Sequence, residues 1–236
     1  MDEQKAQQQY YADTADQYDA MHLDEQDEHY FALTFLLAAV DWCGAKSILD
    51  VGAGTGRAIQ HFQRLKPDVR VVGVEPVREL REIGYRKGIP EENLVSGDAN
   101  KLRYGPGDFD IVCEFGVLHH VPKPAQVVAE MLRVANKGIF ISDSNNFGQG
   151  SLLSRNIKQL LNLVGLWKFA DYIKTKGKGY TVSEGDGIAY SYSVFNQFRQ
   201  IKNSCSSIHL LNTSNGSGNL YRTASHVGLF GIKDRG

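Results

Sequence analysis

The sequence predicts an α/β protein built on a doubly wound, mostly parallel sheet. Between residues 47 and 143, short β-branched runs alternate with segments of helical periodicity. The runs are apolar along most of their length, which is typical of strands that are buried on both faces. A glycine-rich turn follows the first run directly, and a helical pattern begins after it. This alternation indicates parallel strands with helices covering both sides.

The elements follow one another in a regular order up to residue 143 and irregularly after it. Each predicted strand ends at turn residues or acids, and each predicted helix shows apolar positions at helical spacing. The predicted strands span residues 47–51, 69–75, 93–96, 109–114, 138–143, 207–211 and 226–232, and the predicted helices span 56–66, 77–87, 124–136 and 193–203.

The region after residue 143 contains a further helical pattern with a continuous apolar face. Arg155, Lys158 and Gln159 fall on the opposite face. We expect the apolar face to be core or a dimer contact. It consists of Leu152, Leu153, Ile157, Leu160, Leu161 and Val164.

The composition fits one globular domain. The 236 residues carry 26 basic and 27 acidic side chains, so the net charge is −1. This balance disfavours nucleic acid as a partner, because a polyanion binder shows a strongly basic footprint. We see neither a signal peptide nor an apolar run long enough to span a bilayer. We therefore expect a cytoplasmic monomer or homodimer without a membrane partner.

The turn after the first strand, Asp50–Arg57, carries the most specific signal in the chain. A dinucleotide-binding G-x-G-x-x-G pattern would place its third glycine at position 57, where this chain has Arg57. Asp50 closes the preceding strand, and a carboxylate there repels a pyrophosphate but can engage a cationic amino-acid ligand. The small residues let backbone amides approach that ligand closely. The turn therefore favours S-adenosylmethionine (SAM) over a nicotinamide cofactor.

Acids at the ends of later strands fit the same ligand. Glu75 ends the second strand about twenty residues beyond the turn, where a carboxylate can hold both ribose hydroxyls. Asp98 follows the third strand and is placed to accept from an adenine amino group. Ligands of such sheets bind at the carboxyl ends of the strands.

These motifs resemble the class I SAM-dependent methyltransferases of small molecules. The resemblance covers residues 45–145, with the motifs in the order and spacing of the family. It implies a Rossmann-like sheet of seven strands whose last strand is antiparallel. The motifs are Leu49–Gly56, Gly73–Pro76, Gly97–Ala99, Phe109–Val112 and Val117–Val121.

The resemblance also assigns roles to residues of the cofactor site. It implies that Gly52 and Gly54 line the methionine part, Glu75 the ribose, and Asp98 with Ala99 the adenine. An N-terminal helix of this family often covers the cofactor, and Tyr11 and Tyr18 match its pattern. We expect the remaining lining to come from Asp50, Ala53, Pro76, Glu114 and Phe115.

The resemblance divides this single domain into four parts. We expect an N-terminal helical lid (1–44), a SAM-binding core (45–143), a helical, substrate-selecting insert (144–205) and closing strands (206–236).

Two adjacent histidines are the candidate catalytic residues. His119 and His120 follow the fourth strand, and one of them is a candidate general base for a hydroxyl acceptor. Adjacent side chains point in different directions, so at most one is expected to reach the substrate, and a structural role for both stays open. His29, in the acidic N-terminal part, is expected to lie on a solvated helix face.

A divalent metal is an alternative means of activating a hydroxyl. Glu114, Asp143 and Asn145 stand at the ends of the fourth and fifth strands, and oxygen ligands suit Mg²⁺. Asp143 and Asn145 fit turn chemistry equally well.

The insert is the expected site of acceptor selection. Residues 151–180 hold six cations against one acid, Asp171, and aromatic residues are interspersed among them. This composition suits a sugar, a phosphorylated substrate or an acidic metabolite, and the arrangement is weakly similar to sugar O-methyltransferases of polysaccharide pathways.

We conclude from the sequence that the chain is a SAM-dependent methyltransferase, with a hydroxyl as the favoured acceptor. The alternatives are a nitrogen- or carbon-methylating enzyme of the same fold, a SAM-binding partner protein without catalysis, and a nicotinamide oxidoreductase.

Overall fold

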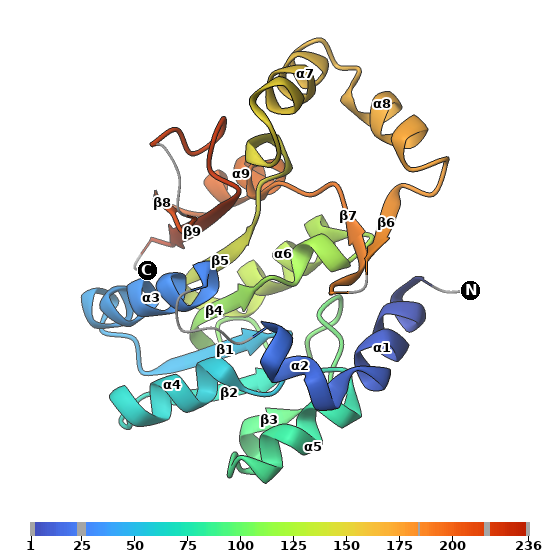
Figure 1. Ribbon diagram of the computed structural model, residues 1–236. Helices are drawn as coiled ribbons and strands as arrows, with labels where there is room; N and C mark the ends of the chain where they lie inside the picture. The colour runs from blue at the N-terminus through green and yellow to red at the C-terminus, as the bar shows by residue number, and fades with distance from the viewer. Residues whose placement is uncertain (1–2, 23–26, 184, 215–217, 235–236) are drawn as a thin grey trace.

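The computed structural model describes residues 3–22, 27–183, 185–214 and 218–234. A seven-stranded sheet forms its centre (Figure 1), in the order β3-β2-β1-β4-β5-β9-β8. The first five strands are parallel, and β9 runs antiparallel to both β5 and β8. The predicted seven-stranded architecture is thus confirmed. The strands are β1 (Ser47–Val51), β2 (Arg70–Val74), β3 (Leu94–Val95), β4 (Phe109–Phe115), β5 (Ala135–Ser144), β8 (Ser207–Asn212) and β9 (His226–Ile232).

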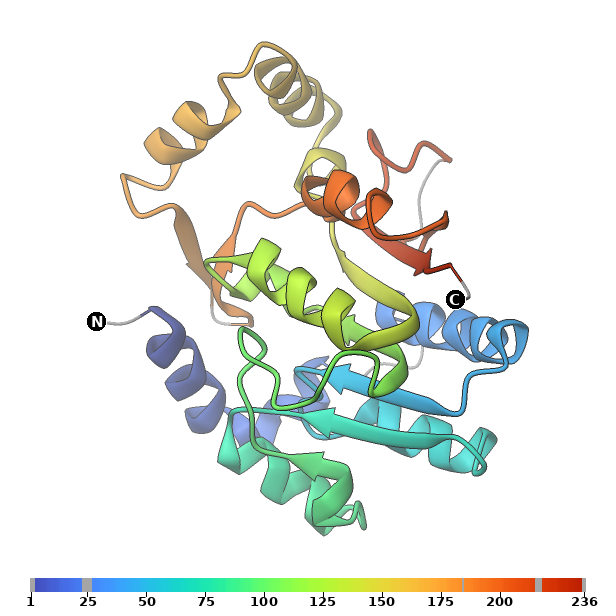
Figure 2. The same ribbon diagram turned by 180° about the vertical axis from the view of Figure 1, so that it is seen from behind.

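Helices cover both faces of this sheet (Figures 1 and 2). Successive strand side chains point to opposite faces, so Ile48 packs in the cluster that contains α3 and α4, while Leu49 packs in the cluster that contains α6 and α9. Both side chains are fully buried. The helices are α3 (Glu28–Cys43), α4 (Arg57–Leu65), α5 (Arg78–Arg86), α6 (Pro124–Val134) and α9 (Phe198–Lys202), with short 3₁₀ turns η1 (Glu91–Asn93), η2 (Leu118–His120) and η4 (Val194–Gln197).

Two N-terminal helices lie beside the carboxyl ends of the strands. These are α1 (Glu3–Asp13) and α2 (Ala15–His22). Both contact α5, and α1 also contacts a strand of the insert. Whether these helices act as a lid stays a prediction.

The insert between β5 and β8 contains a β-hairpin as well as helices. It begins with η3 (Asn146–Gly148), α7 (Leu152–Leu163) and α8 (Trp167–Lys174). An antiparallel hairpin of β6 (Tyr180–Ser183) and β7 (Gly187–Tyr190), which the sequence analysis did not predict, follows. The hairpin contacts α1 and η2, so it reaches the carboxyl ends of the sheet.

Among the described helices, none combines the length and apolarity that a membrane span requires.

Gly73 shows how closely the β1–α4 turn packs on β2. A Cβ atom at this position would lie 2.5 Å from the Cβ of Ala53 and 2.9 Å from Cδ1 of Ile59. We expect Gly73→Ala to lower the free energy of unfolding by about 1–3 kcal/mol, the usual cost of overpacking. Denaturant titration measures the change. Gly218→Ala is the control, because no atom lies within 4 Å of its added methyl group; equal loss in both variants would contradict the packing explanation.

Candidate functional site

Three adjoining cavities lie at the carboxyl ends of the strands. We call them the β2-side cavity, the central cavity and the hairpin-side cavity. The first two share six lining residues, so they form one continuous cleft. The central cavity and the hairpin-side cavity share His119 and Asp186. The β2-side cavity includes Glu75, Pro76, Asp98 and Ala99, the central cavity includes Asp50, Ala53 and Arg57, and the hairpin-side cavity includes Ser144, Lys174, Tyr190, Tyr192 and His226. The first two cavities share Tyr11, Tyr18, Gly52, Phe115, Gly116 and His120.

The glycine turn after β1 is bonded to the end of β2. The backbone N–H of Gly54 donates to the Glu75 carboxylate at 3.0 Å, and that of Val77 donates to its second oxygen at 2.8 Å. Gly52 and Gly54 have φ values of 74° and 55°, in the left-handed region that favours glycine. The turn thereby brings the predicted residues of the cofactor site together at the cleft.

Two of the acids that line the cleft, Asp50 and Glu75, are buried, and their pKa values are raised. Burial raises the pKa of Asp50 to about 7, against the opposing effect of Arg57. Burial also raises the pKa of Glu75 to about 7, although its backbone hydrogen bonds act in the other direction. Because a nearby cation favours the ionised form, these carboxyls are suited to a positively charged ligand.

The N-terminal helices close the cleft over the glycine turn. The hydroxyl of Tyr18 lies so near Gly54 that a Cβ atom there would be 2.6 Å from it. The rings of Tyr11 and Tyr18 pack edge to face with centroids 5.7 Å apart. The Tyr11 hydroxyl lies 3.1 Å from Nε2 of His120. Both tyrosines thus lie where the sequence analysis expected lid residues.

His119 forms an ion pair with a carboxylate beneath the cleft. Its Nδ1 lies 2.7 Å from Oδ1 of the fully buried Asp143. Asp143 also accepts from the backbone N–H groups of Leu118 at 2.7 Å and Ser144 at 2.5 Å. Burial would lower the pKa of His119, but Asp143 and Asp186 outweigh it and raise the pKa to about 10. His119 is therefore an imidazolium at neutral pH.

Asp186 is a site residue that the sequence analysis missed. It lies in the turn of the β6–β7 hairpin, with carboxylate oxygens 3.6 Å from Nε2 of His119 and 3.2 Å from Nε2 of His120. Nδ1 of His120 donates to the Ile188 carbonyl at 2.7 Å. The Gly185-Asp186-Gly187 sequence was a turn signal, but it did not indicate what the turn contacts.

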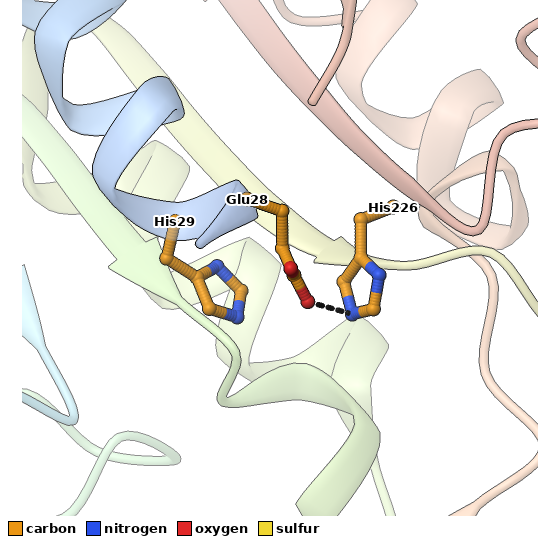
Figure 3. A group of neighbouring side chains, drawn as sticks. All are labelled: Glu28, His29 and His226. Carbon is orange, nitrogen blue, oxygen red and sulfur yellow. Dashed lines mark ion pairs between the residues drawn. The ribbon is translucent and has the colours of Figure 1, made fainter. Parts of the chain in front are cut away.

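His29 lies inside the structure and not on a solvated helix face as the sequence analysis expected. Its Nδ1 is 3.0 Å from the Ser142 hydroxyl, and its ring lines the central cavity. Burial and the nearby Arg57 lower the pKa of His29 to about 3. Figure 3 shows it beside Glu28 and His226, whose carboxylate and Nε2 form an ion pair at 3.1 Å.

The described residues contain two groups that could supply three ligand atoms to one metal ion. They are Glu28–His29–His226 and His119–His120–Asp186, with ligand atoms within 4.8 Å of one another in each group. Both groups contain two imidazoles, whereas Mg²⁺ prefers oxygen ligands. Ion pairs within the groups already account for their geometry.

The predicted Mg²⁺ ligands do not form a site. Asn145 accepts from the Ser193 hydroxyl at 2.8 Å, and its amide nitrogen donates to three carbonyls of the 220–224 loop. Asp143 is occupied by His119 and backbone donors. Glu114 is fully buried, accepts from the Val117 N–H at 2.8 Å, and lines none of the three cavities. Glu114 was also expected to line the cofactor site, and this expectation is wrong for the same reason: its side chain lines none of the three cavities.

The core of this chain is similar in sequence to known methyltransferases. Residues 49–142 match the family model described as a methyltransferase domain. A demethylmenaquinone methyltransferase from Roseiflexus sp. (strain RS-1) is 32% identical over 117 residues, which are 49% of this chain and 48% of that protein. A ubiquinone biosynthesis O-methyltransferase from Proteus mirabilis is 27% identical over 137 residues, or 56% of each chain. The chain thus spans about half the length of these curated relatives.

A solved structure shares the fold over nearly the whole chain. It is the magnesium protoporphyrin IX methyltransferase of Synechocystis PCC 6803 with bound SAH. The two structures superpose with a TM-score of 0.62, and the match covers 99% of this chain and 100% of the other chain. Its sequence is 14% identical, so the likeness concerns the fold.

The lowered pKa of His29 predicts how acid affects stability. The unfolded imidazole takes up a proton near pH 6.5, but the folded one does so only near pH 3. The stability that His29 contributes is therefore present above pH 6.5 and is lost as the pH falls toward 3. We expect a smaller loss between pH 7 and about 4.5 in His29→Gln than in the wild type, measured by denaturant unfolding. Identical pH profiles would contradict the burial of a neutral ring.

Proposed function

We propose that this chain, whose residues 49–142 match the family model described as a methyltransferase domain, transfers a methyl group from SAM to an ionisable hydroxyl of a small molecule. The observation that carries the proposal is the continuous cleft, with buried carboxyls along one part and the His119–Asp143 ion pair at the other. The first part suits a cationic nucleoside, and the second suits an acceptor oxygen.

The residues of the β2-side and central cavities suit the positive charge of SAM. Glu75 offers a carboxylate to the ribose hydroxyls, and Asp98 with Ala99 forms the adenine end of the lining. Gly52 and Asp50 border the central cavity, where the methionine part would lie beside backbone that carries no side chain. The raised pKa of Asp50 supports this assignment, because a buried acid gains from a cationic ligand.

SAM, when bound, supplies an electrophilic methyl carbon for in-line displacement. The protein has to align the acceptor and exclude water, and orientation alone contributes about 7–11 kcal/mol. Tyr11 and Tyr18 cover the cleft from the N-terminal side, and Phe115 lies at the junction of its two parts. These three side chains would hold the reacting groups in a confined space.

His119 is the candidate catalytic residue of the histidine pair. Asp143 holds its Nδ1, so Nε2 is the atom directed toward the acceptor, on the side where Asp186 lies 3.6 Å away. The imidazolium charge favours an acceptor oxygen in its ionised form, which is the form that attacks. Both ring nitrogens of His120 already contact the lid and the hairpin, so we assign it a positioning role.

An ionisable hydroxyl, such as a phenol, fits this site better than a sugar hydroxyl. The His119 imidazolium can donate a hydrogen bond to an oxyanion, whereas a sugar hydroxyl needs a base that is neutral at working pH. The Proteus mirabilis relative is named as an O-methyltransferase, which supports oxygen as the acceptor atom.

Replacing the ribose carboxylate should weaken cofactor binding. We expect Glu75→Gln to reduce SAM affinity by about 10- to 100-fold, the value of a hydrogen bond to a charged group, as measured by calorimetry. Wild-type binding near neutral pH should release protons, because a cationic ligand lowers carboxyl pKa values that lie near 7. Calorimetry in buffers of different ionisation enthalpy detects this release.

The exposed Glu79 on α5 provides the matched control. Glu79→Gln should leave SAM affinity unchanged. Equal affinities of the wild type and Glu75→Gln, or binding of NADH in place of SAM, would refute the cofactor assignment.

Loss of the His119 imidazolium should slow turnover without changing the affinity for SAM. With catechol as the acceptor and SAH formation as the assay, we expect His119→Gln to lower kcat by about a hundredfold. SAM affinity should stay unchanged. The rate of the variant should rise more steeply from neutral to mildly alkaline pH, because the phenol then ionises without help from His119.

His209→Gln, which alters an exposed imidazole on β8, controls for unspecific effects of the substitution. Methylation of methyl glucoside but not of catechol would overturn the proposal that the acceptor is an ionisable hydroxyl. A parallel loss of SAM affinity and kcat in His119→Gln would show that His119 only maintains the fold.

A further inference from the structure

Residues 151–178, here called the arm, expose most of the large apolar side chains on the molecular surface. The arm contains α7 and α8, which extend beyond the sheet in both views (Figures 1 and 2). Neither helix has a buried residue. Fifteen large apolar side chains are exposed in the described part of the chain, and ten belong to the arm: Leu152, Leu153, Ile157, Leu160, Leu163, Val164, Leu166, Phe169, Tyr172 and Ile173.

The amphipathic helix α7 has its apolar stripe directed away from the protein. Its polar side chains hold it to the body: Gln159 donates to the carbonyls of Phe147 and Arg222, and Asn162 donates to the Tyr221 hydroxyl at 2.9 Å. Lys158 bonds to the Asn146 carbonyl on the same side. The opposite stripe has helical spacing and faces outward. It contains Leu153, Ile157, Leu160 and Val164, with exposed fractions of 71%, 49%, 60% and 57%.

The shorter helix α8 is oriented in the same way. Trp167 packs on Phe147 with ring centroids 5.6 Å apart, and Asp171 accepts from the Ser191 hydroxyl, so these side chains face the body. Phe169 and Ile173 lie on the other side and are 65% and 61% exposed. An apolar surface of this extent marks an interaction site, because monomeric soluble proteins rarely leave one uncovered.

The charge of the arm indicates what covers this surface. The arm carries six cations and one acid, Asp171, whose carboxylate faces the body. Four of the cations are exposed and lie on α8 or directly after it: Lys168, Lys174, Lys176 and Lys178. Two copies of the arm would bring like charges together. A surface that is both apolar and negatively charged complements the arm in both respects.

We propose that the arm binds the surface of a lipid bilayer that contains anionic lipids. The apolar stripes of α7 and α8 would lie at the boundary between headgroups and acyl chains, and the exposed lysines would pair with anionic headgroups. Interfacial helices of this kind need no membrane-spanning length. The proposal departs from the sequence-based expectation of no membrane partner, and it does not depend on the proposed methyl transfer.

The arm stands next to the hairpin-side cavity. Lys174 at the end of α8 and Thr181 on β6 both line this cavity. Binding of the arm to a bilayer would therefore place the hairpin-side cavity beside the membrane surface.

Vesicle co-sedimentation of the full chain tests the proposal. We expect binding to vesicles of phosphatidylcholine with phosphatidylglycerol, weaker binding to phosphatidylcholine alone, and weakening by salt. The triple variant Leu153→Ser, Leu160→Ser, Phe169→Ser should reduce binding at least about tenfold. The triple variant Lys168→Glu, Lys176→Glu, Lys178→Glu should do the same. All six side chains are exposed, so both variants should fold.

Leu65→Ser with Trp42→Ser is the matched control, since these two apolar side chains are exposed outside the arm. This variant should bind vesicles like the wild type. The proposal is overturned if the wild type does not bind anionic vesicles, or if the control loses as much binding as the arm variants. Sedimentation velocity supplies a further test: a wild-type dimer that the apolar arm variant converts to a monomer would show that a second copy covers the arm instead.

Discussion

The hydrogen bond from the backbone N–H of Gly54 to the Glu75 carboxylate fixes the arrangement on which the cleft depends. It joins the turn after β1 to the end of β2, and the second oxygen of Glu75 extends the connection to Val77. Because Gly54 has no side chain, Tyr18 of the lid can lie directly on the turn. One buried carboxylate thus determines the floor of the cleft and permits its closure, and it remains directed toward the cavity where a ribose would bind.

The two parts of the cleft differ in ionisation because their acids have different partners. Asp50 and Glu75 are buried with few opposing charges, so their pKa values rise to about 7. Asp143 is equally buried, but His119 and backbone donors hold its pKa at about 2. Burial raises a carboxyl pKa only when no cation compensates it. Ionisation of the first part would therefore respond to a cationic ligand, while the second part holds an imidazolium at neutral pH.

The insert contributes both to the cleft at the histidine pair and to the exposed apolar surface of the arm. Its hairpin brings Asp186 to both histidines and also contacts α1, so the lid, the hairpin and the end of β4 meet at one place. Its helices turn their polar sides to the body and their apolar sides outward. A folded chain retains such an outward apolar face where another apolar phase covers it. The same segment thus connects the histidine pair at the cleft with the proposed membrane surface.

The sheet, the glycine turn and the acids at the strand ends could be predicted from the amino-acid sequence alone. These features are local: strand periodicity, glycine spacing and the residue that ends a strand are all visible within a few positions. The partners of these side chains lie far away in the sequence, so they depend on how the chain folds. Asp186 lies against His119 and His120, His29 lies 3.0 Å from the Ser142 hydroxyl, and Asn145 bonds to a distant loop. Likewise, the apolar stripe of α7 was evident from its spacing, but its direction was not, because periodicity defines a face without showing which side of the helix meets the protein.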